Sequence, residues 1–143
     1  MRKFLKWSVP LIAVALAATT LLPASSASAR TSSTLYKLEL ISIMCNNQQD
    51  TIGPDKVRMY INGAFVDGPR SFHRGDSHTF TNTNALFTGV ATIEAWEEDG
   101  ISNDDFLGSV TVSQNASGGG IQTGYFDALK HAKYTILYEV TPN

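Results

Sequence analysis

The chain has one cysteine, Cys45, among its 143 residues, so no disulfide can form within it. It contains no Gly-x-Ser-x-Gly elbow, no His-Glu-x-x-His helix motif and no glycine-rich phosphate loop. These absences argue against the hydrolases, metalloproteases and nucleotide-binding enzymes that depend on those motifs. Cys45 ends an apolar segment, where a lone cysteine is expected to be buried as a small apolar residue.

Basic charge is scarce outside the amino terminus. Residues 1–29 carry three basic residues, then an apolar run from Val9 to Leu22, then small residues ending at Ala29, which is the order of a secretory signal. Prolines and threonines interrupt the run, which is too short to span a bilayer. We therefore expect cleavage after Ala29 and a secreted domain at 30–143. That domain keeps eight basic residues against thirteen acidic ones, a net charge of −5, which excludes nucleic acid as a partner.

No segment after the signal has a sustained helical period of apolar residues, whereas β-branched and aromatic segments recur between turn residues. Tyr134, Ile136, Tyr138 and Val140 alternate with mostly polar residues, and Asn62-Gly63 is typical of a tight hairpin. The sequence predicts an all-β fold, an antiparallel β-sandwich of about eight strands. The expected strands are 35–45, 57–61, 64–66, 77–83, 89–97, 107–114, 124–128 and 134–140.

Acidic residues are concentrated in one short stretch. Six of them fall within the twelve positions 94–105, which contain no lysine or arginine. They bracket the loop between two predicted strands, where like charges repel unless a cation neutralises them. The six are Glu94, Glu97, Glu98, Asp99, Asp104 and Asp105. The alternative is a solvated acidic loop.

A second acidic loop, residues 50–55, precedes the predicted strand at 57–61. If both loops emerge at the same end of the sandwich, their carboxylates form a cup, and oxygen ligands in irregular geometry favour calcium over magnesium. The predicted metal ligands are Asp50, Asp55, Glu97, Asp99 and Asp105, with Asp104 as a substitute. Ile101 is expected to crown the acidic loop, where it would contact a membrane or a protein partner.

These residues carry a resemblance to a known family. The patterns Asp50-x-x-Gly53-x-Asp55-x-Val57 and Glu97-x-Asp99-x5-Asp105-x-Leu107-Gly108 resemble the calcium- and lipid-binding β-sandwich family named for the second conserved domain of protein kinase C, the C-two family. The chain is also similar to small secreted bacterial domains with the same plan. The resemblance covers residues 35–140 and implies a C-two-like fold that binds calcium. Glu97 stands where the family has aspartate.

The sequence as a whole predicts a secreted, non-catalytic binding module with calcium as its cofactor. Two alternatives from other classes remain open. One is a secreted hydrolase or toxin with an unrecognised site, and the other is a structural or inhibitory domain whose acidic loops bind no metal. The sequence does not name the partner or the oligomeric state.

Overall fold

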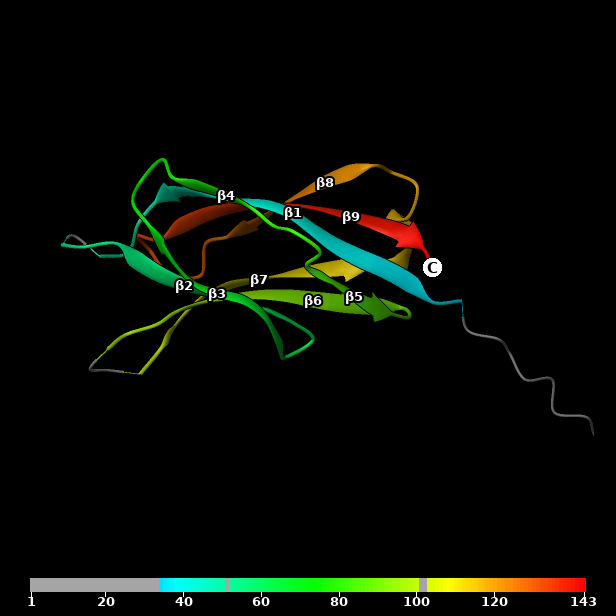
Figure 1. The fold of residues 1–143 in the computed structure, drawn as a ribbon, viewed down its shortest axis with the longest axis horizontal. Coiled ribbons are helices and arrows are strands. Elements are labelled where there is room, and N and C mark those ends of the chain that lie inside the picture. The colour runs from blue at the N-terminus through cyan, green and yellow to red at the C-terminus, as the bar shows by residue number, and fades with distance from the viewer. Residues whose placement is uncertain (1–33, 51, 101–102) are drawn as a thin grey trace, which may run out of the picture. The chain divides into compact units, whose positions relative to one another are not determined.

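The computed structural model describes residues 34–50, 52–100 and 103–143. The predicted secretory signal at residues 1–29 and the predicted loop residue Ile101 lie outside the described residues. Within them, nine strands form two antiparallel sheets (Figure 1). The strands are β1 (Tyr36–Asn47), β2 (Asp55–Ile61), β3 (Ala64–Phe72), β4 (Ser77–Thr79), β5 (Asn84–Phe87), β6 (Val90–Glu97), β7 (Asp105–Ser113), β8 (Ile121–Phe126) and β9 (Lys133–Pro142).

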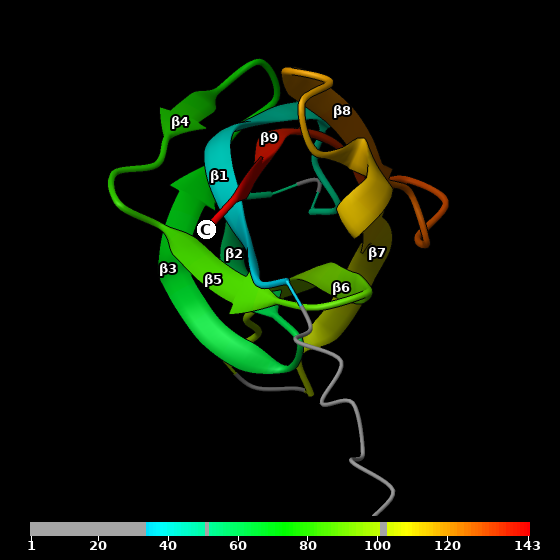
Figure 2. The ribbon, with the colours of Figure 1, turned by 90° about the vertical axis from the view of Figure 1, so that its right-hand side faces the viewer.

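The first sheet has the order β4-β1-β9-β8, with β5 also pairing with β1, and the second has the order β3-β2-β6-β7. Viewed from the end of the strands, the two sheets face each other around a shared interior (Figure 2). The predicted all-β antiparallel sandwich is confirmed. In the described part of the chain, no helix is long and apolar enough to cross a membrane.

The strand count differs from the prediction at one edge. The expected strand at 77–83 forms only the short strand β4, and β5 follows it at residues that no expected strand covers. The two pair with different halves of β1. The chain bends between them at Asn82, whose φ is +55°. A polar residue in this left-handed conformation interrupts an extended segment, and the sequence does not reveal that interruption.

The hairpin at Asn62-Gly63 is confirmed. Both residues have positive φ angles, 52° and 75°, and Ile61 lies opposite Ala64 across the turn. Two consecutive positive φ angles match the right-handed twist of the strands that the turn connects. The turn therefore joins β2 to β3 as neighbours.

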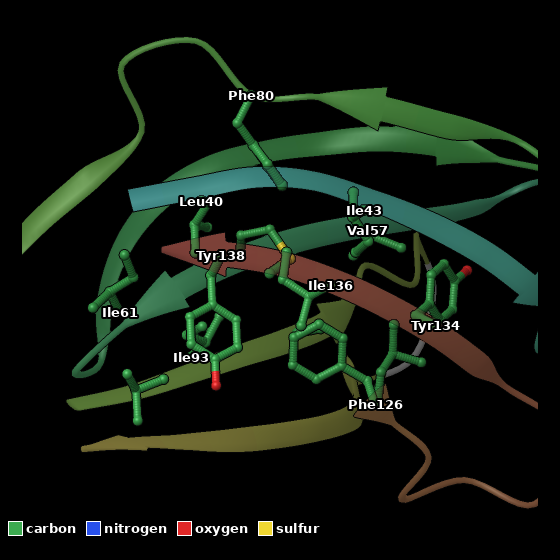
Figure 3. Close-up of a cluster of buried hydrophobic side chains, with 14 of the residues drawn as sticks. Leu40, Ile43, Val57, Ile61, Phe80, Ile93, Phe126, Tyr134, Ile136 and Tyr138 are labelled. Atoms are coloured by element: carbon green, nitrogen blue, oxygen red, sulfur yellow. The ribbon is translucent and has the colours of Figure 1, made fainter. Parts of the chain in front are cut away.

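The core lies between the sheets and follows the alternation of each strand (Figure 3). On β9 the side chains of Tyr134, Ile136, Tyr138 and Val140 are buried, as predicted.

On β1 the alternation is reset by a bulge between Leu40 and Ser42, because two residues of the bulged strand then oppose one on its partner. Leu38 and Leu40 before the bulge, and Ile43 and Cys45 after it, consequently all face inward and are buried.

Candidate functional site

The pairing of β2 with β6 brings the two acidic loops to one end of the sandwich. Val57, near the start of β2, lies opposite Glu97 at the end of β6. Glu97 in turn lies opposite Asp105, the first residue of β7. Because these pairs are antiparallel, the loop that precedes β2 and the loop between β6 and β7 must emerge together.

Three of the five predicted ligands approach one another closely. One carboxylate oxygen from each of Asp50, Glu97 and Asp99 lies within 4.8 Å of the others. Asp50 belongs to the β1–β2 loop, whereas Glu97 and Asp99 belong to the end of β6 and the loop after it. We call these three residues the acidic cup.

Glu97 lies on the inward face of β6, where the other buried residues of the strand are apolar. Ala91, Ile93, Ala95 and Glu97 are all buried on β6, and Glu97 is only 2% exposed. Its Oε1 accepts a hydrogen bond from the Lys56 backbone amide at 3.2 Å. Its Oε2 is buried and accepts no hydrogen bond from any residue that the structure describes. A buried, unsatisfied carboxylate oxygen is rare in proteins and indicates a ligand or ordered solvent at that point.

The electrostatics of the cup favour a cation. Burial raises the pKa of Glu97 to about 7, and the carboxylates of Asp99, Asp50 and Asp55 add to the rise. The pKa of Asp50 is also raised, by desolvation first and then by the carboxylates of Asp55, Asp99 and Asp105. Each of these groups disfavours the ionised form of its neighbours, and a bound cation reverses that effect.

Asp55 is near the cup but is held by hydrogen bonds. It is fully buried at the start of β2, in phase with Val57. Its Oδ2 accepts bonds from the Gln49 backbone amide at 2.7 Å and from the Tyr134 hydroxyl at 2.5 Å. Its Oδ1 accepts a bond from the Asp50 backbone amide at 3.0 Å. The predicted ligand Asp55 therefore fixes the backbone of the β1–β2 loop.

Asp105, the fifth predicted ligand, is linked to the same loop by a side chain. Its Oδ2 accepts a hydrogen bond from the Gln49 amide nitrogen, while the Gln49 Oε1 is buried without a hydrogen-bond partner among the described residues. The amide group of Gln49 therefore connects the loop before β2 to the first residue of β7. Its unsatisfied oxygen is a neutral donor of the kind calcium accepts.

Two other acidic residues of the 94–105 stretch are engaged by a basic side chain. Arg58, on the outward face of β2, forms ion pairs with Glu98 at 2.6 Å and with Asp104 at 3.3 Å. The stretch itself contains no basic residue, but the neighbouring strand supplies one. Asp104, the predicted substitute ligand, is thus paired with Arg58.

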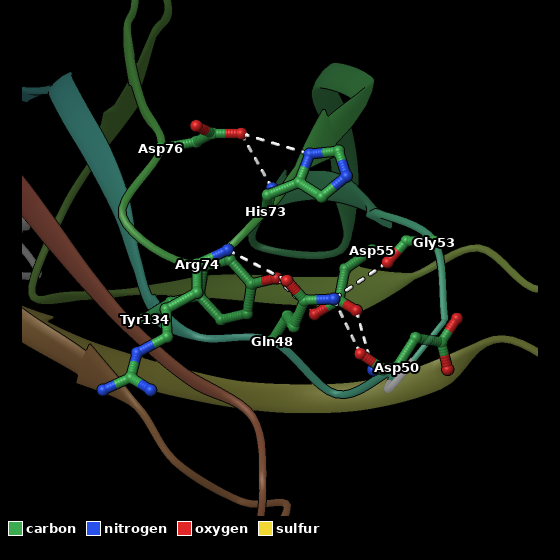
Figure 4. Close-up of polar contacts among 8 residues, drawn as sticks. All are labelled: Gln48, Asp50, Gly53, Asp55, His73, Arg74, Asp76 and Tyr134. Carbon is green, nitrogen blue, oxygen red and sulfur yellow. Dashed lines mark hydrogen bonds and ion pairs between the residues drawn. The ribbon is translucent and has the colours of Figure 1, made fainter.

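Gln48 is a second loop residue that the sequence reasoning missed, and Figure 4 shows its contacts. Its side-chain nitrogen donates to the carbonyls of Asp50 and Gly53 at 2.7 and 2.8 Å. Its side-chain oxygen accepts a bond from the Arg74 backbone amide at 2.9 Å. Gln48 thereby closes the β1–β2 loop on itself and ties it to the turn between β3 and β4. The signal in the sequence is the pair Gln48-Gln49 directly before Asp50, which carries no charge and therefore does not mark a cation site.

No family model matches the chain, and no curated protein matches its sequence. Solved C2 domains, which form the C-two family, are similar to it in fold. One of them, described as the structure of a C2 domain, is 13% identical with a TM-score of 0.47, over 76% of this chain and 98% of that one. A structure of two C2 domains, A and B, of Extended-Synaptotagmin 2 is 17% identical with a TM-score of 0.49, over 94% of this chain and 48% of that one.

A calcium-bound structure of the same two Extended-Synaptotagmin 2 domains is 14% identical with a TM-score of 0.47, over 76% of this chain and 45% of that one. The chain thus spans about half the length of both Extended-Synaptotagmin 2 structures. The predicted antiparallel β-sandwich is confirmed by its two sheets, and the C2 domains are similar to it in fold. What the site binds must be argued from its own residues.

Proposed function

We propose that this protein is a secreted, non-catalytic binding module that holds calcium in the acidic cup. The observation that carries the proposal is the Oε2 of Glu97, a buried carboxylate oxygen that accepts no hydrogen bond from the described residues and belongs to a group of three converging carboxylates. A solvated acidic loop does not explain it, because Glu97 is only 2% exposed. An ionised carboxylate so deeply buried costs several kcal/mol unless a partner compensates it.

The donor set favours calcium among common cations. It consists of the carboxylates of Asp50, Glu97 and Asp99, and the carboxylate of Asp105 is near enough to Asp50 to raise its pKa. All of these donors are oxygens, which suits hard cations. They come from two loops and a strand end, and calcium tolerates such irregular geometry better than magnesium does.

The test is a calcium titration on a matched pair of variants. In the parent, a few millimolar calcium should raise the melting temperature by about 4 °C, which corresponds to about 1 kcal/mol for a dissociation constant near 1 mM. Glu97→Gln should abolish the rise, because it keeps the shape of the side chain and removes its charge. Glu94→Gln, an outward position on the same strand, should keep the rise. Calorimetry measures the affinity directly.

Magnesium and sodium chloride at matched ionic strength are the controls for this titration. Both should stabilise the protein less than calcium does. Equal stabilisation by all three salts would mean simple screening of an acidic face, and the calcium site would then be rejected.

An exposed isoleucine in the β1–β2 loop, which also carries Asp50 of the cup, supports a membrane surface as the partner. Ile52, two residues after Asp50, is 91% exposed. Burying such a side chain stabilises a complex by about 1.5–3 kcal/mol. Calcium in the cup would remove the repulsion between this acidic end and anionic headgroups, so that Ile52 could enter the interface.

A further inference from the structure

Asp55 differs from the three cup residues in how its oxygens are used. It is 0% exposed, and both of its carboxylate oxygens accept hydrogen bonds from protein donors. It is not a member of the group whose oxygens converge within 4.8 Å. Two of its three donors are consecutive backbone amides, those of Gln49 and Asp50. The buried carboxylate of Asp55 thus fixes the backbone of the β1–β2 loop at Gln49 and Asp50, and Asp50 is the first cup residue in the chain.

The third donor comes from the opposite sheet. Tyr134 lies on β9 of the first sheet, whereas Asp55 begins β2 of the second. The Tyr134 side chain is 1% exposed, and its ring packs edge-on against Phe72 with centroids 5.9 Å apart and an interplanar angle of 86°. Strand alternation and this packing fix the ring, so the hydroxyl is held at Asp55 (Figure 4).

We propose that Asp55 and Tyr134 form a brace between the two sheets that positions the β1–β2 loop for cation binding, with Asp55 acting as a positioning residue and not as a ligand. The inference rests on the calcium site proposed above. Through Asp55, the brace fixes the amides of Gln49 and Asp50. It thereby sets where the Asp50 carboxylate enters the cup and where the Gln49 amide meets Asp105.

The deciding variant is Tyr134→Phe, which removes one donor from Asp55 without changing the charge of any carboxylate. If Asp55 were a direct ligand, freeing its Oδ2 would leave calcium affinity unchanged or raise it. A brace predicts the opposite, because the loop loses its anchor in the opposite sheet. Removing groups that orient metal ligands weakens metal binding about 10- to 100-fold. We therefore expect at least about a tenfold loss of calcium affinity by calorimetry.

Tyr138→Phe is the matched control. Tyr138 is buried on the same face of the same strand, and the bonds that the structure gives to Asp55 do not include its hydroxyl. The variant should keep the calcium affinity of the parent. Equal affinities for Tyr134→Phe and Tyr138→Phe would overturn the brace.

A second measurement needs no metal and separates failure of the brace from failure of the calcium site. Hydrogen exchange followed by NMR in EDTA reports on the Gln49 and Asp50 amides directly. In the parent both amides should exchange slowly, and in Tyr134→Phe both should exchange at least about tenfold faster. If they exchange in the parent as fast as exposed loop amides, or equally slowly in both proteins, the brace does not exist. Slow exchange in a parent that binds no calcium would reject the site and keep the brace.

Discussion

Two buried carboxylates, Asp55 and Glu97, lie at positions where the alternation of their strands places apolar side chains. Ionised groups are costly there unless they are compensated. Asp55 is compensated by three protein donors. Glu97 has one, the Lys56 amide. Burial therefore differs in its consequence at the two residues. Both oxygens of Asp55 accept hydrogen bonds from the protein, whereas Oε2 of Glu97 accepts none from the described residues.

The pKa of Glu97 predicts how pH affects the metal-free protein. Burial, and then the neighbouring carboxylates, raises this pKa to about 7 from 4.5. Between these values the folded state holds a proton that the unfolded state has lost, so stability must fall as pH rises from 4.5 to 7. The loss should be roughly 3 kcal/mol. Urea unfolding in EDTA at pH 5 and pH 8 measures it.

Glu97→Gln isolates this effect from the titration of other carboxylates. The variant cannot ionise at this position, so it should lose roughly 3 kcal/mol less than the parent between the two pH values. Parallel loss of stability in both proteins would show that Glu97 titrates normally in the fold.

Among the strands, the close approach of β7 and β8 depends on glycine. A Cβ placed on Gly124 of β8 would lie 2.7 Å from Val110 Cγ2 of β7 and 3.0 Å from Ile136 Cγ2 of β9. Real Cβ atoms do not come so near another carbon in a packed core, and Val110 is β-branched and stiff at χ1. Gly124 thus lets the edges of the two sheets pack directly.

Gly124→Ala should destabilise the protein by about 1–3 kcal/mol through overpacking. Val110→Ala should also destabilise it, by removing methyl groups of a partly buried side chain that packs against the core. The double variant should be destabilised by less than the sum of the two, because the smaller residue at 110 makes room for the new methyl group. Denaturant unfolding of the parent, the two single variants and the double variant gives the coupling free energy. If the two losses of stability simply add, a clash with Val110 is not the reason for glycine at position 124.

Across the sandwich, the acidic loops, the exposed Ile52 and the Asp55–Tyr134 brace lie at the same end. The chain carries a net charge of −2 over its full length, so it offers no general attraction to an anionic surface. Under the proposed function, any attraction would come from calcium bound at this end. Membrane binding is therefore expected to require calcium.

Co-sedimentation with phosphatidylserine-containing vesicles tests the partner surface. The parent should bind in calcium and not in EDTA. Ile52→Ser should weaken the binding at least about tenfold, since it removes an apolar side chain without changing charge, and should leave calcium affinity without vesicles unchanged. Leu86→Ser, at a 50% exposed position on β5, should bind like the parent. Equal binding by both variants would mean that Ile52 does not enter the membrane, and a protein partner should then be sought.

The class of fold, most strand positions and the carboxylates that gather at one end could all be predicted from the amino-acid sequence. Alternation is a local property, so Val57 on β2 and Ile136 on β9 could be assigned to the core from neighbouring residues alone. The Asn62-Gly63 hairpin is equally local, because its backbone angles depend on two residues. Cys45 is buried as its apolar neighbours indicated.

How the gathered carboxylates are used depends on the packed sandwich. Three acidic residues accept hydrogen bonds from side chains that are 46 or more positions away in the chain: Asp104 from Arg58, Asp55 from Tyr134 and Asp105 from Gln49. Such pairs depend on the register and spacing of the sheets. The sequence pattern predicts five metal ligands and does not distinguish among them: Asp50, Asp55, Glu97, Asp99 and Asp105. The fold separates them, because Asp55 receives three hydrogen bonds while Asp50, Glu97 and Asp99 converge. Burial and hydrogen bonding are long-range outcomes of folding, and they place identical side chains in different environments.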